Sequence, residues 1–307
     1  MLLGEITVHS IIDGDITGLP ATGFPGRSPE EWQPYQEHLD PRGNLVSQIG
    51  SFLVRTGDRL LLVDAGGGVD EHGAPRDDLR DQLGNQFRAK GLTGAAVDAA
   101  IDLALTTKMR HGALPDSLAA AGVRPEDITD VILTHLHADH IGWVSAHGKP
   151  FFPNAVVRCS AQDLDYFFGP QVDESFTMAV WGSPSARERL APVLDRIETF
   201  DRDQAIAPGV DVELAPGHTP GSSVVVLSSG RERALILGDM VHCPVELQDA
   251  EWQCIGDFDP ELARRTKEIY LREMEEGASV GAGSHFPGLR FGRLVPGAAG
   301  PGWTFVS

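Results

Sequence analysis

The chain has 307 residues, of which 41% are hydrophobic, so it can bury the core of one large folded domain and is not expected to be disordered. Its 25 Lys and Arg against 44 Asp and Glu give a formal net charge of −19, and a field of this sign repels polyanions. We therefore expect no nucleic-acid partner, and the charge is compatible with a small-molecule substrate.

The first residues, 1–5, carry no basic stretch ahead of an apolar run, and nowhere do about 18 apolar residues follow one another. We therefore expect no membrane association and a cytoplasmic location. The cysteines are Cys159, Cys243 and Cys254, an odd number without CxxC spacing, so neither a disulfide framework nor a thiolate zinc site is indicated. Any metal bound here must use nitrogen and oxygen ligands.

Short β-branched and aliphatic runs at 6–8 and 60–63 predict opening strands, the second of which ends at Asp64 in a glycine-rich turn. Residues 15–45 between them are rich in Gly and Pro and carry Trp32. They are predicted to form a surface loop that folds back over a pocket.

Residues 76–112 are predicted to form an all-helical insert. Apolar residues recur there at spacings of three and four, as in amphipathic helices: Leu79, Leu83, Phe87, Val97, Ile101 and Leu105. These stripes require burial, either against each other, in a homodimer interface, or as a lid over the pocket.

The rest of the chain alternates strands and helices, which predicts a layered α/β structure. The predicted helices are 115–121 and 260–276, and the predicted strands are 131–133, 212–214, 223–227, 234–237 and 278–282. We expect residues 1–307 to form a single domain.

Four potential metal ligands lie within six positions directly after the predicted strand 131–133. They are His135, His137, Asp139 and His140. In an extended segment residues i and i+2 face the same side, so His135 and His137 can bind one ion while the turning chain presents Asp139 and His140 to a second.

Three further residues, His218, Asp239 and His285, each lie in a loop after a predicted strand. Alone, such a histidine or aspartate is more often a solvated or turn residue. Their order changes this interpretation. From about residue 45 to 290, the chain resembles the metallo-β-lactamase superfamily, whose ligand pattern is His-x-His-x-Asp-His, then His, then Asp, then His.

The resemblance implies an αββα sandwich, in which two mixed β-sheets are flanked by helices, with a pair of metal ions at one edge. It implies that His135, His137 and His218 bind one ion, that Asp139, His140 and His285 bind the other, and that Asp239 bridges them. Asp64 matches an early aspartate of the superfamily that supports the ligands from behind.

Two divalent ions favour hydrolysis, because a hydroxide bridging them can attack an ester, lactone or phosphotriester while one ion polarises the scissile oxygen. Zinc is the first expectation, and iron, manganese and cobalt suit the same donors. Asp139, Asp239 and His242 are the predicted catalytic residues. The alternative function is a non-catalytic metal-binding protein of the same fold.

Among branches of the superfamily, His137 stands where the oxygen-reducing diiron branch has a glutamate, and the bridging Asp239 disfavours the true β-lactamases. Acyl-homoserine lactonases and methyl parathion hydrolase-like enzymes remain. The better-known lactonases place a tyrosine three residues after the bridging aspartate, where this chain has His242, and this favours the second group. His242 is either a proton donor in the pocket or a structural histidine.

Aromatic residues could line an apolar pocket, although the core is the more common place for each of them. They are Trp143, Phe151, Phe152, Tyr166, Phe167, Phe168, Trp252 and Phe286.

Overall fold

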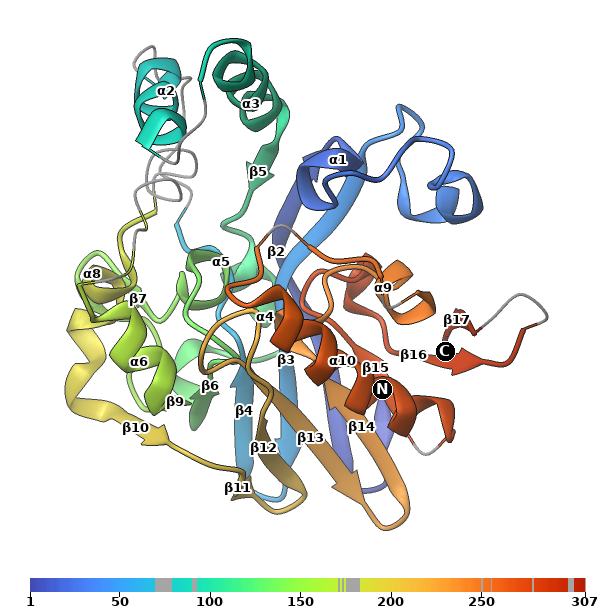
Figure 1. The fold of residues 1–307 in the computed structure, drawn as a ribbon. Coiled ribbons are helices and arrows are strands. Elements are labelled where there is room, and N and C mark those ends of the chain that lie inside the picture. Colours follow the sequence, from blue (N-terminus) through green and yellow to red (C-terminus); the bar gives the residue numbers. More distant parts are fainter. Residues whose placement is uncertain are drawn as a thin grey trace.

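Two β-sheets packed face to face form the centre of the structure (Figure 1). It is a computed structural model, which describes residues 1–69, 79–89, 93–170, 172, 174, 183–249, 251–254, 256–277, 279–297 and 301–306.

The first sheet has the strand order β1-β2-β3-β4-β6-β9-β10 within the described residues, and β5 pairs with β2. Its strands are β1 Leu2–Leu3, β2 Ile6–Gly18, β3 Leu45–Thr56, β4 Arg59–Val63, β5 Lys108–Arg110, β6 Asp130–Ile132, β9 Val156–Ser160 and β10 Ile197–Phe200. Strands β4, β6 and β9 run parallel, so they end at the same edge of the sheet.

The second sheet has the strand order β11 through β17 across the part of the chain that the structure describes. Its strands are β11 Gln204–Ala207, β12 Val210–Leu214, β13 Ser223–Ser229, β14 Glu232–Ile236, β15 Val280–Ala282, β16 Gly292–Val295 and β17 Gly302–Phe305. Strands β11 to β14 form an antiparallel meander, and β15 then lies parallel to β14.

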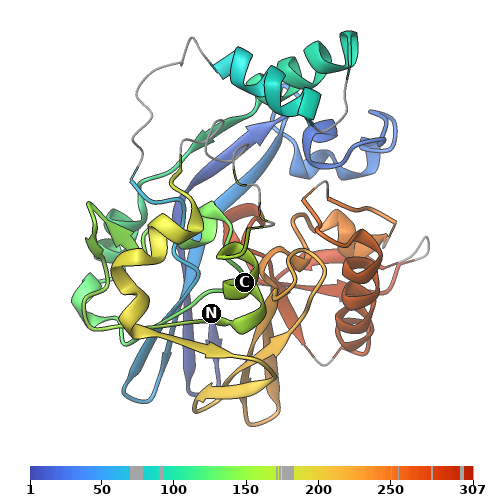
Figure 2. The same ribbon diagram turned by 60° about the vertical axis from the view of Figure 1, so that its left-hand side comes forward.

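Helices cover both outer faces, and Figure 2 shows green and yellow helices on one side of the sheets and an orange-red helix on the other. On the first sheet lie α4 Leu114–Ala120, α6 Ala161–Phe167 and α8 Ala186–Leu190, and on the second lies α10 Pro260–Glu275. Shorter elements are α1 Pro20–Gly23, α5 Ala138–Ile141, α9 Val245–Gln248, η1 Gln33–His38, η2 Pro125–Asp127, η3 Ala191–Arg196, η4 Gly238–Met240, η5 Pro287–Leu289, β7 Ser145–Ala146 and β8 Lys149–Pro150. The predicted αββα sandwich is confirmed.

The layers follow from strands that are apolar on both faces. In β13, Val225 and Leu227 face the core between the sheets, whereas Val224 and Val226 face the layer under α10, and all four are fully buried. Each such side chain contributes roughly 1.5–3 kcal/mol of hydrophobic stabilisation relative to an exposed one.

The predicted insert contains two helices, α2 Leu79–Ala89 and α3 Ala95–Thr106, which pack against each other away from the sandwich (Figure 1). Leu83, Val97 and Ile101 are buried, whereas Leu105 is exposed. Residues 76–78 and 90–92, and the side chains of Leu79 and Phe87, lie outside the described part. The prediction of an all-helical insert was wrong at its end, because Lys108–Arg110 returns as strand β5 along β2.

The predicted loop at 15–45 is shorter than expected, since β2 continues through Gly18. The segment beyond it folds back through aromatic packing, in which the rings of Phe24 and Trp32 contact Trp252 at centroid distances of 5.8 and 4.8 Å. This region therefore covers the second half of the chain near α9. In the residues that the structure describes, no helix is both long and apolar enough to cross a bilayer.

Asp13 joins several of these segments and was missed in the sequence. Its buried carboxylate accepts hydrogen bonds from the backbone N–H groups of Gly67, Gly112 and Leu114, at 2.7 to 3.0 Å. It also accepts one from the indole N–H of Trp143, at 3.0 Å. Asp13 thus ties β2 to the glycine-rich turn after β4 and to the start of α4.

We expect Asp13→Ala to lower the free energy of unfolding by roughly 2–5 kcal/mol, because it leaves buried N–H donors without acceptors. Urea denaturation measures this change. The control is Asp15→Ala on the same strand, whose partly exposed ion pair with Arg110 contributes about 1 kcal/mol or less. Equal losses in both variants would contradict the role assigned to Asp13.

Candidate metal centre

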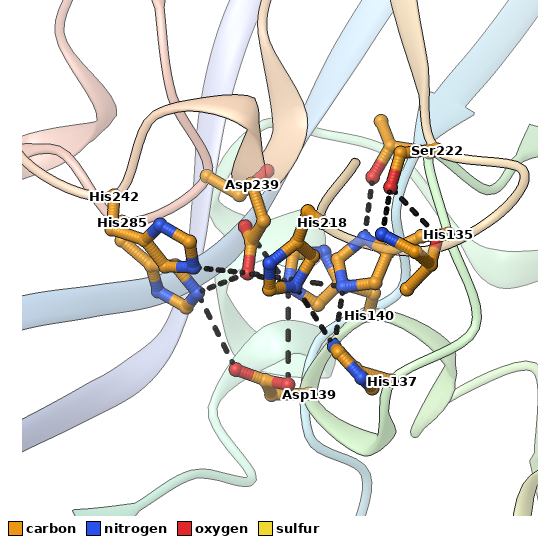
Figure 3. Close-up of polar contacts among 12 residues, drawn as sticks. His135, His137, Asp139, His140, His218, Ser222, Asp239, His242 and His285 are labelled. Carbon is orange, nitrogen blue, oxygen red and sulfur yellow. Dashed lines mark hydrogen bonds and ion pairs between the residues drawn. The ribbon is translucent and has the colours of Figure 1, made fainter. Parts of the chain in front are cut away.

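Loops after five strands meet at one edge of the sandwich and bring the predicted ligands together. Residues 135–140 follow β6, His218 follows β12, Asp239 follows β14 and His285 follows β15. Asp64, at the end of β4, lies beneath them. Figure 3 shows the imidazole and carboxylate groups of these loops pointing toward one another.

Three imidazole nitrogens form the first group of donors. The Nδ1 atom of His137 lies 3.0 Å from His135 Nε2 and 3.0 Å from His218 Nε2. A tetrahedral zinc ion with Zn–N bonds of about 2.0–2.1 Å places neighbouring nitrogens ~3.3 Å apart, close to this spacing. The triad is therefore compact enough to share one ion.

The second group consists of Asp139, His140 and His285, with Asp239 between it and the first group. His140 Nε2 lies 3.3 Å from Asp239 Oδ1, and His285 Nε2 lies 3.1 Å from Asp239 Oδ2 and 3.5 Å from Asp139 Oδ2. On the other side, His218 Nε2 lies 3.5 Å from Asp239 Oδ2. The Asp239 carboxylate therefore faces both groups.

Two of these buried atoms lack a hydrogen-bond partner, and both point into the cluster: His140 Nε2 and Asp239 Oδ1. The other nitrogen of His140, Nδ1, lies 2.9 Å from the Asp64 carboxylate, so it carries the proton in the neutral ring. The lone pair of His140 Nε2 then faces the Asp239 carboxylate, so neither group can donate a hydrogen bond to the other. A cation between them satisfies both acceptors. The nitrogen and oxygen donors present thus fit a pair of divalent ions.

The electrostatics of the two groups differ. Burial, followed by the neighbouring His218, lowers the pKa of His137 to about 3, so its lone pair is free at neutral pH. Burial also acts to lower the pKa of His140, but the Asp239 and Asp64 carboxylates outweigh it and raise that pKa well above its usual range. The carboxylate side of the cluster therefore attracts positive charge.

Asp64 orients the predicted ligands from behind, as the sequence indicated. Its buried carboxylate accepts hydrogen bonds from the backbone N–H and hydroxyl of Thr134 and from the hydroxyl of Ser284, in addition to His140 Nδ1. Thr134 Oγ1 in turn lies 3.2 Å from Nδ1 of His135. One carboxylate thus holds two of the predicted ligand loops, the one after β6 through Thr134 and His140 and the one after β15 through Ser284.

His218 and His285 are oriented by groups that no sequence motif identified. His218 Nδ1 lies 3.1 Å from the Asp257 carboxylate, and His285 Nδ1 lies 2.7 Å from the backbone oxygen of Gln48. Each contact places the proton on Nδ1 and turns Nε2 toward the centre. Asp257 and Gln48 are distant in sequence from their partners, so only the fold reveals them.

Asp239 reaches the centre because Gly238 precedes it. Gly238 has φ +53°, and a Cβ at this position would lie 2.9 Å from Cβ and Oγ1 of Thr134. A larger residue would be strained in this backbone conformation and would push the two loops apart.

Asp163 in α6 connects the loop after β6 with the loop after β12, and it was not identified from the sequence. It accepts hydrogen bonds from the Thr219 hydroxyl at 2.8 Å, from the Gly221 N–H at 2.6 Å and from the backbone N–H of Leu136. Burial raises the pKa of this carboxyl to about 6.

His242 also reaches the cluster, with its Nε2 3.3 Å from Asp239 Oδ2. Its ring lies nearly parallel to that of His285, at 6° and a centroid distance of 5.7 Å. The His242 side chain is 14% exposed, whereas those of His135, His140 and His218 are 1–2% exposed. His137 is also partly exposed, so the centre opens to solvent on the side of these two histidines.

Most of the aromatic residues considered for a pocket are core residues, the more common case for each of them. Trp143, Phe152, Trp252 and Phe286 are each at most 7% exposed. Phe167 is buried as well, but its ring contacts that of His137 at 5.5 Å.

The raised pKa of Asp163 predicts a pH effect on stability. An acid whose pKa rises from 3.8 to about 6 on folding holds its proton more tightly in the native state, so its contribution to stability is fully present below pH 4 and is lost as pH rises through 6. The decrease is about 3 kcal/mol, two pKa units at about 1.4 kcal/mol each. Asp163→Asn cannot titrate and should lack this component in urea unfolding of the chelated protein between pH 4 and 7.5. Identical profiles for the two proteins would contradict it.

Comparison with known proteins agrees with this fold. The model of the Metallo-beta-lactamase superfamily matches residues 46–276. An N-acyl homoserine lactonase of Bacillus cereus is 26% identical over 236 residues, 75% of this chain and 80% of the relative, and one of Bacillus thuringiensis is 24% identical over 239 residues, 76% and 81%.

Two solved structures share the fold. AidC, a dizinc quorum-quenching lactonase in complex with a product, superposes with a TM-score of 0.78 at 23% identity, covering 100% of this chain and 96% of AidC. The hydrolase AbOPH gives 0.77 at 22% identity, with the same coverage. From its family match and its fold, the chain belongs to the metallo-β-lactamase superfamily.

Proposed function

We propose that this protein is a dinuclear metal-dependent hydrolase acting on the ester bond of a lactone, carboxylic ester or phosphotriester. The observation that carries the proposal is the Asp239 carboxylate, which lies between two groups of ligand-type side chains. The lactonase names of the sequence relatives support the lactone or ester class.

The proposed ligand set assigns one ion to His135, His137 and His218 and the second to Asp139, His140 and His285, with Asp239 shared. We propose zinc for both ions, because histidine and carboxylate ligands suit it and AidC is described as dizinc.

When bound, such an ion pair supplies a water molecule with a pKa near 7 and polarises the scissile oxygen. The protein's part is to orient the imidazoles through Asp64 and Asp257. Two divalent ions bring a charge of +4, of which Asp139 and Asp239 offset 2. The centre therefore remains positive and favours an anionic transition state.

We propose that His242 contacts the substrate. It lies beside Asp239 on the side that reaches solvent, where the better-known lactonases have a tyrosine. Its Nε2 is placed to donate a hydrogen bond to a substrate oxygen, as the phenol would.

We further propose one domain spanning residues 1–307, with an insert at about 76–112, and a cytoplasmic location, which the free cysteines support. Because Leu83, Val97 and Ile101 of α2 and α3 are buried within the chain, these three side chains do not require a second copy. A homodimer through the insert stays a prediction, which light scattering of the intact protein tests.

Metal removal tests the main proposal. We expect chelation to abolish turnover and zinc or cobalt to restore it, in a panel of lactones, aryl esters, phosphotriesters and β-lactams. Asp239→Asn should lower kcat at least about 100-fold, since it withdraws a charge shared by both ions. Stoichiometric metal without turnover on any substrate would favour a non-catalytic metal-binding protein.

We expect His242→Phe to lower kcat about 10- to 100-fold while both ions remain bound, because the ring stays but its hydrogen-bond donor is lost. Metal analysis and steady-state kinetics measure the two quantities separately. His9→Phe, on an exposed position of β2, is the control and should retain full activity. A His242→Phe enzyme with unchanged kcat would show that His242 is structural.

A further inference from the structure

A buried ion pair lies directly behind His242. Lys267 of α10 and Glu246 of α9 are 2% and 1% exposed, and Lys267 Nζ lies 2.8 Å from Glu246 Oε2. Lys267 Nζ also donates a hydrogen bond to the backbone oxygen of Trp252, at 2.9 Å. The pair thus joins two helices to the aromatic cluster that holds the segment around Trp32.

The second oxygen of Glu246 binds the backbone of the loop that follows Asp239. Glu246 Oε1 accepts hydrogen bonds from the N–H groups of His242, at 2.7 Å, and Cys243, at 3.1 Å. These donors follow Asp239 by three and four residues, at the point where the chain turns away from the metal centre. Glu246 therefore determines where the backbone of His242 lies relative to Asp239.

Stability alone is a weak reason for such a pair. Removing two charges from water costs several kcal/mol per ion, and well-packed apolar residues of similar volume often stabilise a protein as much or more. An apolar pair could not, however, accept two N–H groups of the loop. Lys267 offsets the charge of Glu246 and fixes one of its oxygens, so that the other remains directed at the backbone of His242.

We propose that Glu246 and Lys267 are positioning residues that hold the His242 imidazole toward the bound substrate. This inference rests on the proposed hydrolase function, in which His242 donates a hydrogen bond to the substrate.

Two double variants separate the acceptor from the charge. Glu246→Gln with Lys267→Met keeps an oxygen for the two N–H groups, whereas Glu246→Met with Lys267→Met removes it. Both pairs are neutral and similar in volume, and both leave the Trp252 oxygen without Lys267. We call these the Gln variant and the Met variant, after the residue at position 246. We expect the Gln variant to stay within about 3-fold of wild-type kcat. We expect the Met variant to lose the same 10- to 100-fold as His242→Phe, with both ions bound.

The dependence on His242 is tested by combination. If the pair acts through His242, adding the Met variant to His242→Phe should cause no further loss of kcat. A further 10-fold loss in that background, or loss of bound metal, would show a merely structural role and overturn the inference. Full activity of the Met variant, or of His242→Phe, would overturn it as well.

A readout without turnover separates this inference from the proposed function. In the cobalt-loaded protein, imidazole protons near the ions have strongly shifted NMR signals. The signal of His242 is identified as the one that is absent from the spectrum of the His242→Phe variant. It should move in the Met variant and stay in place in the Gln variant. If the Met variant does not fold, Glu246→Asn with Lys267→Met retracts the acceptor by one methylene and should move the signal too; an unmoved signal overturns the inference. A wild-type enzyme without turnover would instead overturn the proposed function.

Discussion

The structure depends on the convergence of lone pairs around one buried carboxylate, that of Asp239. Nitrogens of His140, His218 and His285 lie 3.1 to 3.5 Å from its two oxygens, in a region nearly closed to solvent. Such an arrangement is unfavourable unless positive charge lies among the groups, since burial penalises an unpaired carboxylate. The surrounding loops must therefore be held firmly enough to keep the donors together.

Much of that restraint comes from carboxylates that are not themselves proposed ligands. Asp64 and Asp257 orient the rings of His140 and His218, and Asp163 joins the loops that carry the predicted ligands after β6 and β12. Glu246 plays the same part for His242 through the backbone. Part of the acidic excess of this chain, which is −19 overall, thus lies inside the molecule. Asp64, Asp163 and Glu246 are each satisfied by several hydrogen bonds, as burial of a charge requires.

The sandwich explains why these groups can meet. Strands β4 and β6 run parallel in one sheet, as do β14 and β15 in the other, so Asp64, Asp239 and His285 leave their strands at the same edge. The two outer helical layers shield this edge only in part. The side of His137 and His242 remains open, which is where a substrate of modest size would approach.

The order of the ligands along the chain was sufficient to predict the superfamily, the αββα sandwich and the cluster at 135–140, because these depend on local patterns. Apolar runs predict buried strands, and histidines two residues apart in an extended segment face one side. Asp64 was also recognisable, since it ends a strand that matches the family pattern.

The tertiary structure alone decided the contacts between residues distant in sequence. It brought Asp257 to His218, Gln48 to His285, Asp163 to Thr219 and Lys267 to Glu246, none of which has a spacing that a pattern could show. It also placed Trp143 and Phe286 in the core and added β5 to the end of the insert. The hydrophobicity of a side chain predicts that it will be buried. Only the packing of the layers determines which residues it contacts.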